Sequence, residues 1–422
     1  MTPVPTANQA AERPPDVCIV TGEYPPAIGG VSDYTALLAH HLANLGSRVT
    51  VVTTARDGRA SDPCRASVGG REIERIEIPG WSHRYRREIF DAVASAQADI
   101  VHLQYQTAAF DMAPSINVFP LLLGLNGLRL PVVTTFHDLR APYLFPKAGP
   151  LRRLAVSVLL GASAGAIFTN PADLALARPL RTAAWIPMGP TLVPSSTSSR
   201  TRTRARWAIR EDELCLAHFG FINATKGIES LVRAAERLQR ANLGFRLLFI
   251  GDEVGSADPK NRATAARVRA LAGELGVGSR ITWSGFDAPP EISSALAAAD
   301  LIVLPYADGA SLGRSSLLSC LAHGSAVVTT EPTPSPPVAS KHQIAPFRDP
   351  EPVRALESAV EIVPRNDDAA LARAIYRLWN DAPRRARLAQ AGRDFAARFT
   401  WPDVARATVA FYGRVLQRRT PG

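Results

Sequence analysis

The feature that most constrains the fold is a repeated alternation between short apolar runs and longer amphipathic segments. In the first half of the chain, apolar runs occupy residues 16–21, 48–53, 100–103, 131–135 and 166–169, and residues 34–45 carry apolar side chains at helical spacing. The runs are apolar throughout rather than alternately apolar and polar, which is typical of strands buried on both faces. The pattern therefore predicts a parallel sheet covered by helices.

The alternation stops near residue 187 and then starts again. Residues 187–206 are rich in Pro, Ser, Thr and Arg and lack periodicity, which is typical of a linker. Strand-like runs follow at 214–219, 245–250, 280–283, 301–304 and 326–330, helix-like segments at 228–238, 262–275, 291–299 and 316–322, and two final helices between 383 and 417. The same alternation of strands and helices is thus predicted in both halves of the chain.

We therefore predict two doubly wound α/β domains of similar size that face a cleft. The expected boundaries are a disordered tail at 1–15, a first domain at 16–190, a linker at 191–206, a second domain at 207–398, and a last helix with a tail at 399–422. Ligands of such sheets bind at the carboxyl ends of the strands, so the cleft between the domains is the expected site.

The composition of the chain excludes several classes of function. The chain has 422 residues and a net charge of +10, from 48 basic and 38 acidic side chains. Two Arg-rich stretches, at 200–210 and 384–419, carry much of the excess, but their patterns are typical of a linker and of solvated helix faces, so we expect no nucleic-acid partner. The four cysteines are far apart and lack metal-ligand spacing, and the first fifteen residues lack the apolar core of a signal peptide. We expect no metal site and a cytoplasmic location.

A glycine-containing loop follows the first predicted strand. Residues 23–34 read EYPPAIGGVSDY, so Gly29 and Gly30 stand at the start of the next helix. Bare backbone at a helix N-terminus suits close approach of an anionic or hydroxyl-rich ligand. The alternative is a tight turn, because the loop is not the GxGxxG fingerprint of dinucleotide sites.

Two histidines lie near strand ends. His137 follows the run PVVTTF directly and precedes Asp138, which places it where side chains reach the cleft. His102, within IVHLQY, is expected in a similar place, but a packing role in the core is the alternative. We therefore take His137 as the candidate catalytic histidine.

Cationic candidates come from the second domain. Lys226, one of only four lysines, stands at a helix entry in FGFINATKG, after Gly220, and an ammonium beside free backbone donors is suited to clamping a diphosphate. Arg314 stands at the entry of a later helix. The loop before it would offer backbone donors from Asp308, Gly309, Ala310, Ser311 and Leu312. The alternatives are a solvated lysine and an ordinary turn.

In this order and spacing, these segments resemble the family 4 glycosyltransferases of the GT-B fold. The matching stretches are EYPPAIGGVSDY, RVTVVTT, DIVHLQY, PVVTTFHD, IPMGP, FGFINATKGIESLVRAA, FRLLFIGD, ITWSGF and ADLIVLPYADG…LAHGSAVVTT, and the resemblance covers roughly residues 16–415. The resemblance implies two Rossmann-like domains and a C-terminal helix, residues 400–416, that crosses back to the first domain.

The resemblance also implies an activity. Such enzymes transfer a sugar from a nucleotide-diphosphate sugar with retention of configuration and without a bound metal or other cofactor; the donor lies against the second domain and the acceptor against the first. By resemblance, Lys226 contacts the donor phosphates, His137 lies beside the donor sugar, and Gly30 approaches the diphosphate.

This chain departs from the family pattern at three positions. Phe221 stands where the family often has an arginine, and Ser311 and Ser319 stand where it has two glutamates. Arg314 is our candidate replacement for the arginine and Asp308 for a shifted glutamate, and Ser319 would make a weaker ribose contact. We expect Lys226 and Arg314 to act together, in a cleft that Gly30 and His137 also line.

Two other hypotheses for the function remain at this point. One is a GT-B-like partner protein without turnover, which the missing glutamates favour. The other is a nucleotide-sugar epimerase, which needs acid/base carboxylates; the candidates are Glu23, Asp138 and Asp308.

The acceptor is expected to be a glycan or glycolipid. An acceptor of that kind would bring the protein to the inner membrane surface, and the basic run Arg84–Arg87 beside Ile89 and Phe90 would then contact anionic lipid. The alternative is that this run is a solvated helix start.

Overall fold

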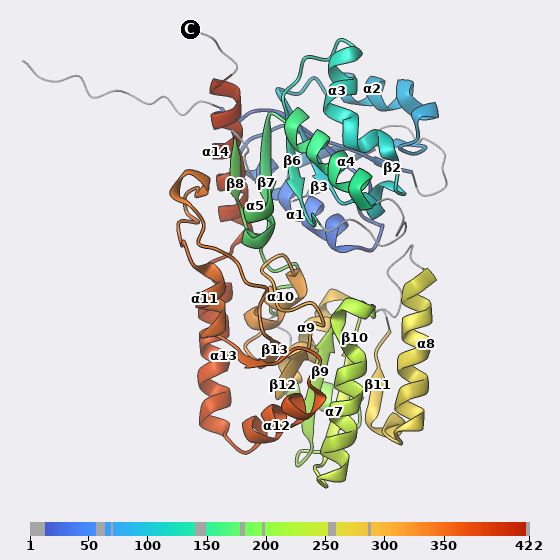
Figure 1. The fold of residues 1–422 in the computed structure, drawn as a ribbon, viewed down its shortest axis with the longest axis vertical. Helices are drawn as coiled ribbons and strands as arrows, with labels where there is room; N and C mark the ends of the chain where they lie inside the picture. The colour runs from blue at the N-terminus through green and yellow to red at the C-terminus, as the bar shows by residue number, and fades with distance from the viewer. Residues whose placement is uncertain are drawn as a thin grey trace, which may run out of the picture.

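The computed structural model has two lobes stacked along its long axis (Figure 1). It describes residues 13–55, 64–68, 71–139, 149–177, 182–195, 199–251, 259–285 and 288–418. Most of the expected tail at 1–15, residues 196–198 of the expected linker and the last four residues lie outside the described residues.

The first lobe is built around an eight-stranded sheet in the order β3-β4-β2-β1-β5-β6-β7-β8. Its strands are β1 (Val17–Thr21), β2 (Val49–Thr54), β3 (Cys64–Val68), β4 (Arg71–Ile78), β5 (Ile100–Tyr105), β6 (Val132–Phe136), β7 (Gly165–Phe168) and β8 (Ala183–Trp185). Its helices are α1 (Gly30–Asn44), α2 (Arg86–Ser95), α3 (Phe119–Leu125), α4 (Gly149–Ala162) and α5 (Pro171–Leu176), with 3-10 turns η1 (His83–Tyr85), η2 (Thr107–Phe110) and η3 (Pro114–Val118). The central strands β1, β5 and β6 are buried along their whole length, as their continuous apolar sequences predict.

One edge of this sheet departs from the expected parallel arrangement. β3 runs antiparallel to β4, whereas the other neighbouring strands pair in parallel. The sequence of β4, REIERIEI, has charged residues at five of its eight positions, and only Ile73, Ile76 and Ile78 are apolar. A search for continuous apolar runs passes over it.

The second lobe repeats the plan with a six-stranded parallel sheet in the order β11-β10-β9-β12-β13-β14. Its strands are β9 (Leu214–Phe219), β10 (Phe245–Ile250), β11 (Ile281–Trp283), β12 (Leu301–Leu304), β13 (Ala326–Thr330) and β14 (Glu361–Val363). Its helices are α6 (Arg200–Arg206), α7 (Ile228–Arg240), α8 (Pro259–Glu274), α9 (Pro289–Ala298), α10 (Ser315–Ala322), α11 (Pro352–Glu357), α12 (Asp368–Trp379) and α13 (Ala382–Ala396), with 3-10 turns η5 (Ala224–Lys226), η6 (Gly278–Arg280) and η7 (Ser340–His342). The prediction of two doubly wound α/β lobes is confirmed.

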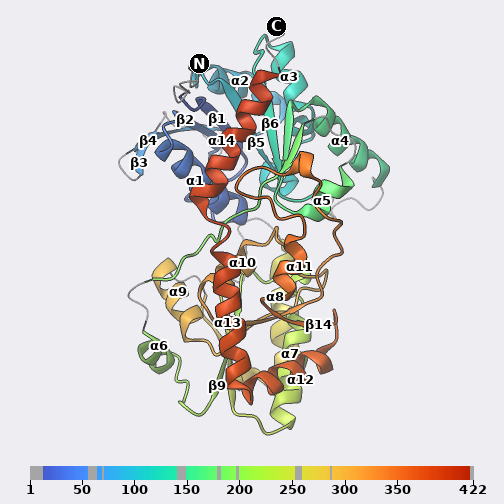
Figure 2. The same cartoon turned by 90° about the vertical axis from the view of Figure 1, so that its left-hand side faces the viewer.

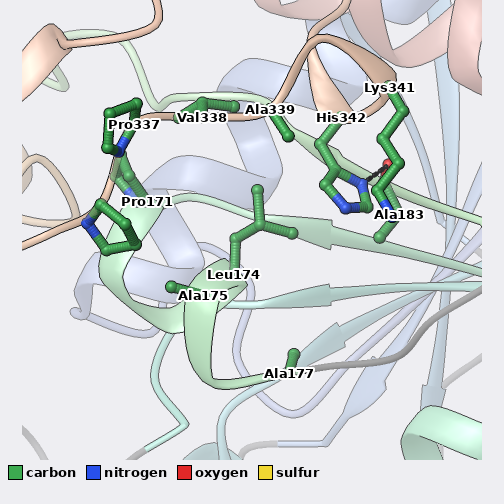
Figure 3. A pocket seen from close by; sticks show the side chains of 11 residues that line it. Pro171, Leu174, Ala175, Ala177, Ala183, Pro337, Val338, Ala339, Lys341 and His342 are labelled. Carbon is green, nitrogen blue, oxygen red and sulfur yellow. Dashed lines mark hydrogen bonds between the residues drawn. The ribbon is translucent and has the colours of Figure 1, made fainter.

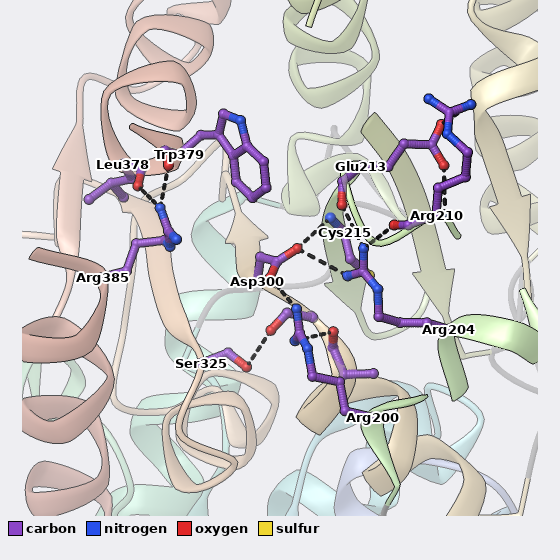
Figure 4. A network of polar contacts seen from close by, with 12 residues as sticks. Arg200, Arg204, Arg210, Glu213, Cys215, Asp300, Ser325, Leu378, Trp379 and Arg385 are labelled. Atoms are coloured by element: carbon purple, nitrogen blue, oxygen red, sulfur yellow. Dashed lines mark hydrogen bonds and ion pairs between the residues drawn. The ribbon is translucent and has the colours of Figure 1, made fainter. Parts of the chain in front are cut away.

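The expected linker at 191–206 is wrong at its carboxyl end, because residues 200–206 form α6. The Ser199 side chain caps this helix by accepting a hydrogen bond from the backbone N–H of Arg202. Arg200 and Arg204 both form ion pairs with Asp300, at the start of β12 (Figure 4). The helix is thus attached to the second lobe by charges rather than by an apolar face, which is why hydrophobic periodicity does not reveal it.

The last helix, α14 (Trp401–Gln417), crosses back to the first lobe, as expected for residues 400–416 (Figure 2). It packs against α1. The Tyr412 hydroxyl lies 2.6 Å from Nδ1 of His102 on β5. A Cβ on Gly165, at the start of β7, would meet Val415 and Phe411 at 2.7 and 2.9 Å, so a glycine there lets the helix lie directly on the sheet.

A second segment also joins the lobes. Residues 336–342 lie over α5 and β8, where Nδ1 of His342 donates a hydrogen bond of 3.0 Å to the Ala183 carbonyl (Figure 3). Between the two layers lies a cavity of about 340 Å³, lined largely by Pro, Ala, Val and Leu side chains. This cavity lies beside the edge strand β8, away from the strand ends that face the other lobe.

Candidate functional site

A cavity of about 390 Å³ lies where the carboxyl ends of the two sheets meet. Most of its lining residues come from loops that directly follow strands or enter helices. They are Glu23, Ile28, Gly29, Gly30, Val31, Gln106, Ala108, His137, Asp138 and Met188 from the first lobe, and Phe221, Asn261, Gly313 and Ser315 from the second. This is the cleft position expected for a doubly wound pair of domains.

The predicted residues of the first lobe, Gly29, Gly30 and His137, all line this cavity. Gly29 precedes α1 in extended backbone, and Gly30 begins the helix. A Cβ added to Gly30 would meet nothing within 4 Å, so the backbone there is open to a ligand. A Cβ on Gly29 would lie 2.3 Å from Oε2 of Glu23, so that carboxylate covers this glycine.

The His137 ring is held in one orientation. Its Nε2 donates a hydrogen bond of 2.9 Å to Oε1 of Gln104, and its ring packs edge-on against Tyr34, with 4.6 Å between the ring centroids. Burial lowers the pKa of His137 to about 3, so the imidazole is neutral at neutral pH. With Nε2 as the donor to Gln104, Nδ1 is left as a hydrogen-bond acceptor. His137 is therefore suited to orienting a hydroxyl rather than to carrying positive charge.

His102 has the packing role, not the catalytic one. It is fully buried, with Nε2 2.7 Å from the Thr135 hydroxyl and Nδ1 beside Tyr412. Burial lowers its pKa to about 3. It joins the sheet to the crossing helix.

The structure brings the two predicted cations together on one aromatic ring. Nζ of Lys226 lies 5.1 Å and Cζ of Arg314 lies 4.2 Å from the centroid of the buried Tyr306 ring. Nζ of Lys226 also donates to Oγ of Ser316 at 3.2 Å, and that oxygen lies 3.0 Å from the Tyr306 hydroxyl. The ring and the hydroxyl thus hold both cations in place.

The local backbone explains why Lys226 lies there. Gly227 has a φ of 65°, and a Cβ on it would lie 1.8 Å from the Pro305 carbonyl oxygen. Only glycine permits this approach, which presses the Lys226 turn against the start of the Tyr306 loop. Burial, and then the charge of Arg314, lower the pKa of Lys226 to about 7. An anion at this place would offset both effects.

Lys226 and Arg314 themselves do not line the cavity; their neighbours Gly313 and Ser315 do. Arg314 forms an ion pair with Asp308, and its Nε has no hydrogen-bond partner among the described residues. Asp308 therefore neutralises part of the charge of Arg314. Gly220 lies beside the pair: a Cβ on it would be 3.4 Å from Nζ of Lys226.

The other expected donor contacts lie elsewhere. Ala310 and Leu312 are buried, and a Cβ on Gly309 would meet the Glu331 carbonyl oxygen at 2.7 Å. Ser311 accepts a hydrogen bond of 3.1 Å from the Gly313 backbone. Ser319 is fully buried and accepts from the Leu192 N–H at 3.2 Å, so it anchors the segment between the lobes. None of these four loop residues, nor Ser319, lines the cavity.

Glu23, named from the sequence only as a candidate carboxylate for an epimerase, also lines the cavity. Burial, and then the charges of Asp111 and Asp33, raise its pKa to about 7. It stands just after a buried strand and before a proline pair. Gln106 and Met188 occupy the same kind of position after β5 and β8.

Two family models match the chain in succession. The "Glycosyl transferase 4-like domain" matches residues 29–185, and "Glycosyl transferases group 1" matches residues 199–395. The chain belongs to the family 4 glycosyltransferases of the GT-B fold. The two matched regions correspond to the two lobes, and the cavity lies between them.

Relatives and solved structures agree with that assignment. The "D-inositol 3-phosphate glycosyltransferase" of Stackebrandtia nassauensis is 30% identical over 227 residues, or 51% of this chain and 45% of that protein. The match thus spans about half the length of the curated relative. The sucrose-phosphate synthase of Thermosynechococcus elongatus has a TM-score of 0.70 at 19% identity, over 96% of this chain and 99% of that one. HepE of Anabaena, solved with UDP and glucose, has a TM-score of 0.70 at 15% identity, over 94% and 99%. These likenesses show the fold.

None of the helices in the described ranges is long and apolar enough to cross a membrane. The described residues also contain no group of three or more His, Cys, Asp or Glu side chains placed to hold a metal ion.

Proposed function

We propose that this protein is a retaining glycosyltransferase that moves a sugar from a nucleotide-diphosphate sugar to a hydroxyl group of a glycan or glycolipid. The single observation that carries the proposal is the cation pair. Lys226 and Arg314 share the Tyr306 ring, and Gly313 and Ser315, on either side of Arg314 in the sequence, line the same cavity as Gly30 and His137. The names of the curated relatives and the UDP bound in HepE support it.

The cation pair fits the leaving group of such a reaction. The bond between the anomeric carbon and the diphosphate oxygen breaks, and the electron pair stays on the diphosphate. Lys226 and Arg314 stabilise the charge that develops there, which lowers the barrier more than it tightens ground-state binding. The open N-terminus of α1 at Gly30 adds backbone donors for the same group.

The remaining steps use neutral groups. The acceptor oxygen forms the new bond on the face of the sugar that the diphosphate leaves, so configuration is retained, and the acceptor proton passes to the departing diphosphate oxygen. His137, neutral and held by Gln104, orients a hydroxyl of the donor sugar through Nδ1. In this proposal the two cations supply the positive charge that a metal ion would otherwise provide.

The first test measures donor binding and turnover. UDP should bind, and UDP-glucose should be hydrolysed slowly or its glucose transferred, with turnover unchanged in EDTA. Lys226→Ala and Arg314→Ala should each lower turnover by about a hundredfold, or about 3 kcal/mol of transition-state stabilisation. Lys341→Ala, an exposed lysine outside the cavity, is the matched control.

The double variant distinguishes a shared diphosphate from separate roles. If both cations act on one group, the double variant loses less than the product of the two single losses. Normal turnover in Arg314→Ala would refute the replacement of the family arginine. UDP binding without any turnover would favour a partner protein, and an epimerised nucleotide sugar would identify an epimerase.

A patch on the first lobe supports contact with a membrane surface. Leu125 is 79% and Leu121 49% exposed on α3, and Arg86 donates hydrogen bonds to Asn126 at the end of that helix. Exposed apolar side chains beside the basic run Arg84–Arg87 suit the interface of an anionic bilayer. We propose that the protein acts at that interface on a lipid-linked acceptor.

A further inference from the structure

Charged residues are distributed unevenly around the cavity. On the second-lobe side the lining residues are uncharged, but Gly313 and Ser315 flank Arg314 in the sequence, and Arg314 shares the Tyr306 ring with Lys226. On the first-lobe side, the charged side chains among the described lining residues are Glu23 and Asp138, and none of those residues is Lys or Arg. The charged groups that line the cavity are therefore acidic and lie on the wall that the acceptor would approach, whereas the two cations of the proposed donor site lie outside the lining.

Glu23 is the carboxylate placed most directly in the acceptor region. It follows β1, lines the cavity, and lies over Gly29, so that it stands next to the open backbone of Gly30. Among the described residues, none donates a side-chain or backbone hydrogen bond to its carboxylate. Asp33 on α1 and Asp111 after η2 add negative charge around it.

This environment has a chemical consequence. A carboxylate without a donor offers acceptor lone pairs to a ligand hydroxyl. A phosphate group in the same place would meet Glu23 and its acidic neighbours, and none of the described residues that line this wall is Lys or Arg. Such like-charge contacts act strongly against the wrong ligand. His137, on the same wall, is neutral and does not offset the carboxylates.

We propose that Glu23 selects an acceptor that presents neutral hydroxyl groups, and no phosphate, to the first-lobe wall, and that it accepts a hydrogen bond from one of those hydroxyls. This inference rests on the proposed glycosyltransferase function and adds the substrate class. It sets this chain apart from the curated relatives named D-inositol 3-phosphate glycosyltransferase.

The test uses pairs of probes that differ only by a phosphate. Binding of myo-inositol and D-inositol 3-phosphate, and of glucose and glucose 6-phosphate, is measured by calorimetry with saturating UDP. The pH is 8, above the pKa of about 7 of Glu23, so that its carboxylate is charged. The wild-type protein should prefer the unphosphorylated member of a pair by about tenfold or more.

Glu23→Gln keeps the shape and removes the charge, so it should reduce that preference by about tenfold. Glu211→Gln, an exposed glutamate remote from the cavity lining, is the matched control and should keep the preference. An unchanged circular dichroism spectrum and an unchanged thermal unfolding midpoint show that the variant is folded.

Three outcomes overturn the inference. They are tighter binding of a phosphorylated probe to the wild-type protein, a preference that Glu23→Gln leaves unchanged, and a failure of both unphosphorylated probes to bind. Failure of UDP itself to bind the wild-type protein would instead overturn the proposed function.

Discussion

Substitution of Asp300 tests which contacts attach α6 to the second lobe. Its Oδ2 accepts a hydrogen bond of 2.7 Å from the Cys215 backbone and lies 3.2 Å from Nη1 of Arg204, while Oδ1 pairs with Arg200 (Figure 4). The Arg204 side chain is only 8% exposed. Removing the carboxylate in Asp300→Ala therefore leaves a buried guanidinium without its counter-charge.

The expected change in the free energy of unfolding follows from these contacts. Breaking a buried ion pair by removing one partner costs about 3–5 kcal/mol, and a buried backbone N–H left without an acceptor costs about 1–3 kcal/mol. Arg204 keeps the Glu213 and Arg210 carbonyls as acceptors, which limits the first figure. We expect Asp300→Ala to lower the free energy of unfolding by about 3–4 kcal/mol. Asp300→Asn, which keeps an oxygen for Cys215, should lower it by about half as much.

Urea unfolding followed by tryptophan fluorescence gives the free energies, and hydrogen exchange of β9 reports on the second lobe. Arg200→Ala is the control: its side chain is 49% exposed, so its pair with Asp300 should contribute less than about 1 kcal/mol. If Asp300→Ala were within 1 kcal/mol of the wild-type protein, or no worse than Arg200→Ala, the buried pair would not be what holds α6.

Two more predictions concern the donor and the membrane. The pKa of about 7 for Lys226 lies below its ordinary value, so at pH 8 about nine-tenths of the free protein lacks this proton, and UDP binding should take up close to one proton at pH 8 and about half a proton at pH 7. Calorimetry in buffers of different ionisation enthalpy measures this uptake, which Lys226→Arg should abolish; equal uptake in that variant would assign the proton to another group. Leu125→Glu should weaken co-sedimentation with vesicles containing one-third phosphatidylglycerol while leaving UDP affinity unchanged. Equal sedimentation of the variant and the wild-type protein would exclude this patch.

The sequence predicts the centres of the sheets better than their edges. The runs that became β1, β9 and β12 are apolar throughout because both their faces are covered, and that property is local to the run. The edge strands β8 and β14 are three residues long and carry too little pattern to detect. Helix α6 is invisible to periodicity because ion pairs attach it.

Some features of the site could likewise be predicted from the sequence, and others could not. Gly30 and His137 could be placed in the cleft because each directly follows a buried strand or starts a helix, and topology alone then fixes their position. The pairing of Lys226 with Arg314 was expected because the family arginine is missing. The Tyr306 ring that holds both side chains was not expected, because its position depends on how two loops fold together. The inward turn of residues 309–312 likewise depends on tertiary contacts, such as that between Gly309 and the Glu331 carbonyl, which sequence does not show.

The crossing helix also sets an order of events during synthesis. Gly165 on β7 and Phe411 on α14 are in contact, yet roughly 250 residues separate them in the chain. At about 5–20 residues per second, the ribosome needs on the order of 12–50 s to make that interval. For this time the nascent first lobe has its sheet but lacks the helix that covers Gly165 and accompanies His102, so the apolar surface of β7 is open to chaperones. The second lobe closes its contacts over shorter intervals, such as that between α7 and α12, so the lobe that starts first is the one finished last.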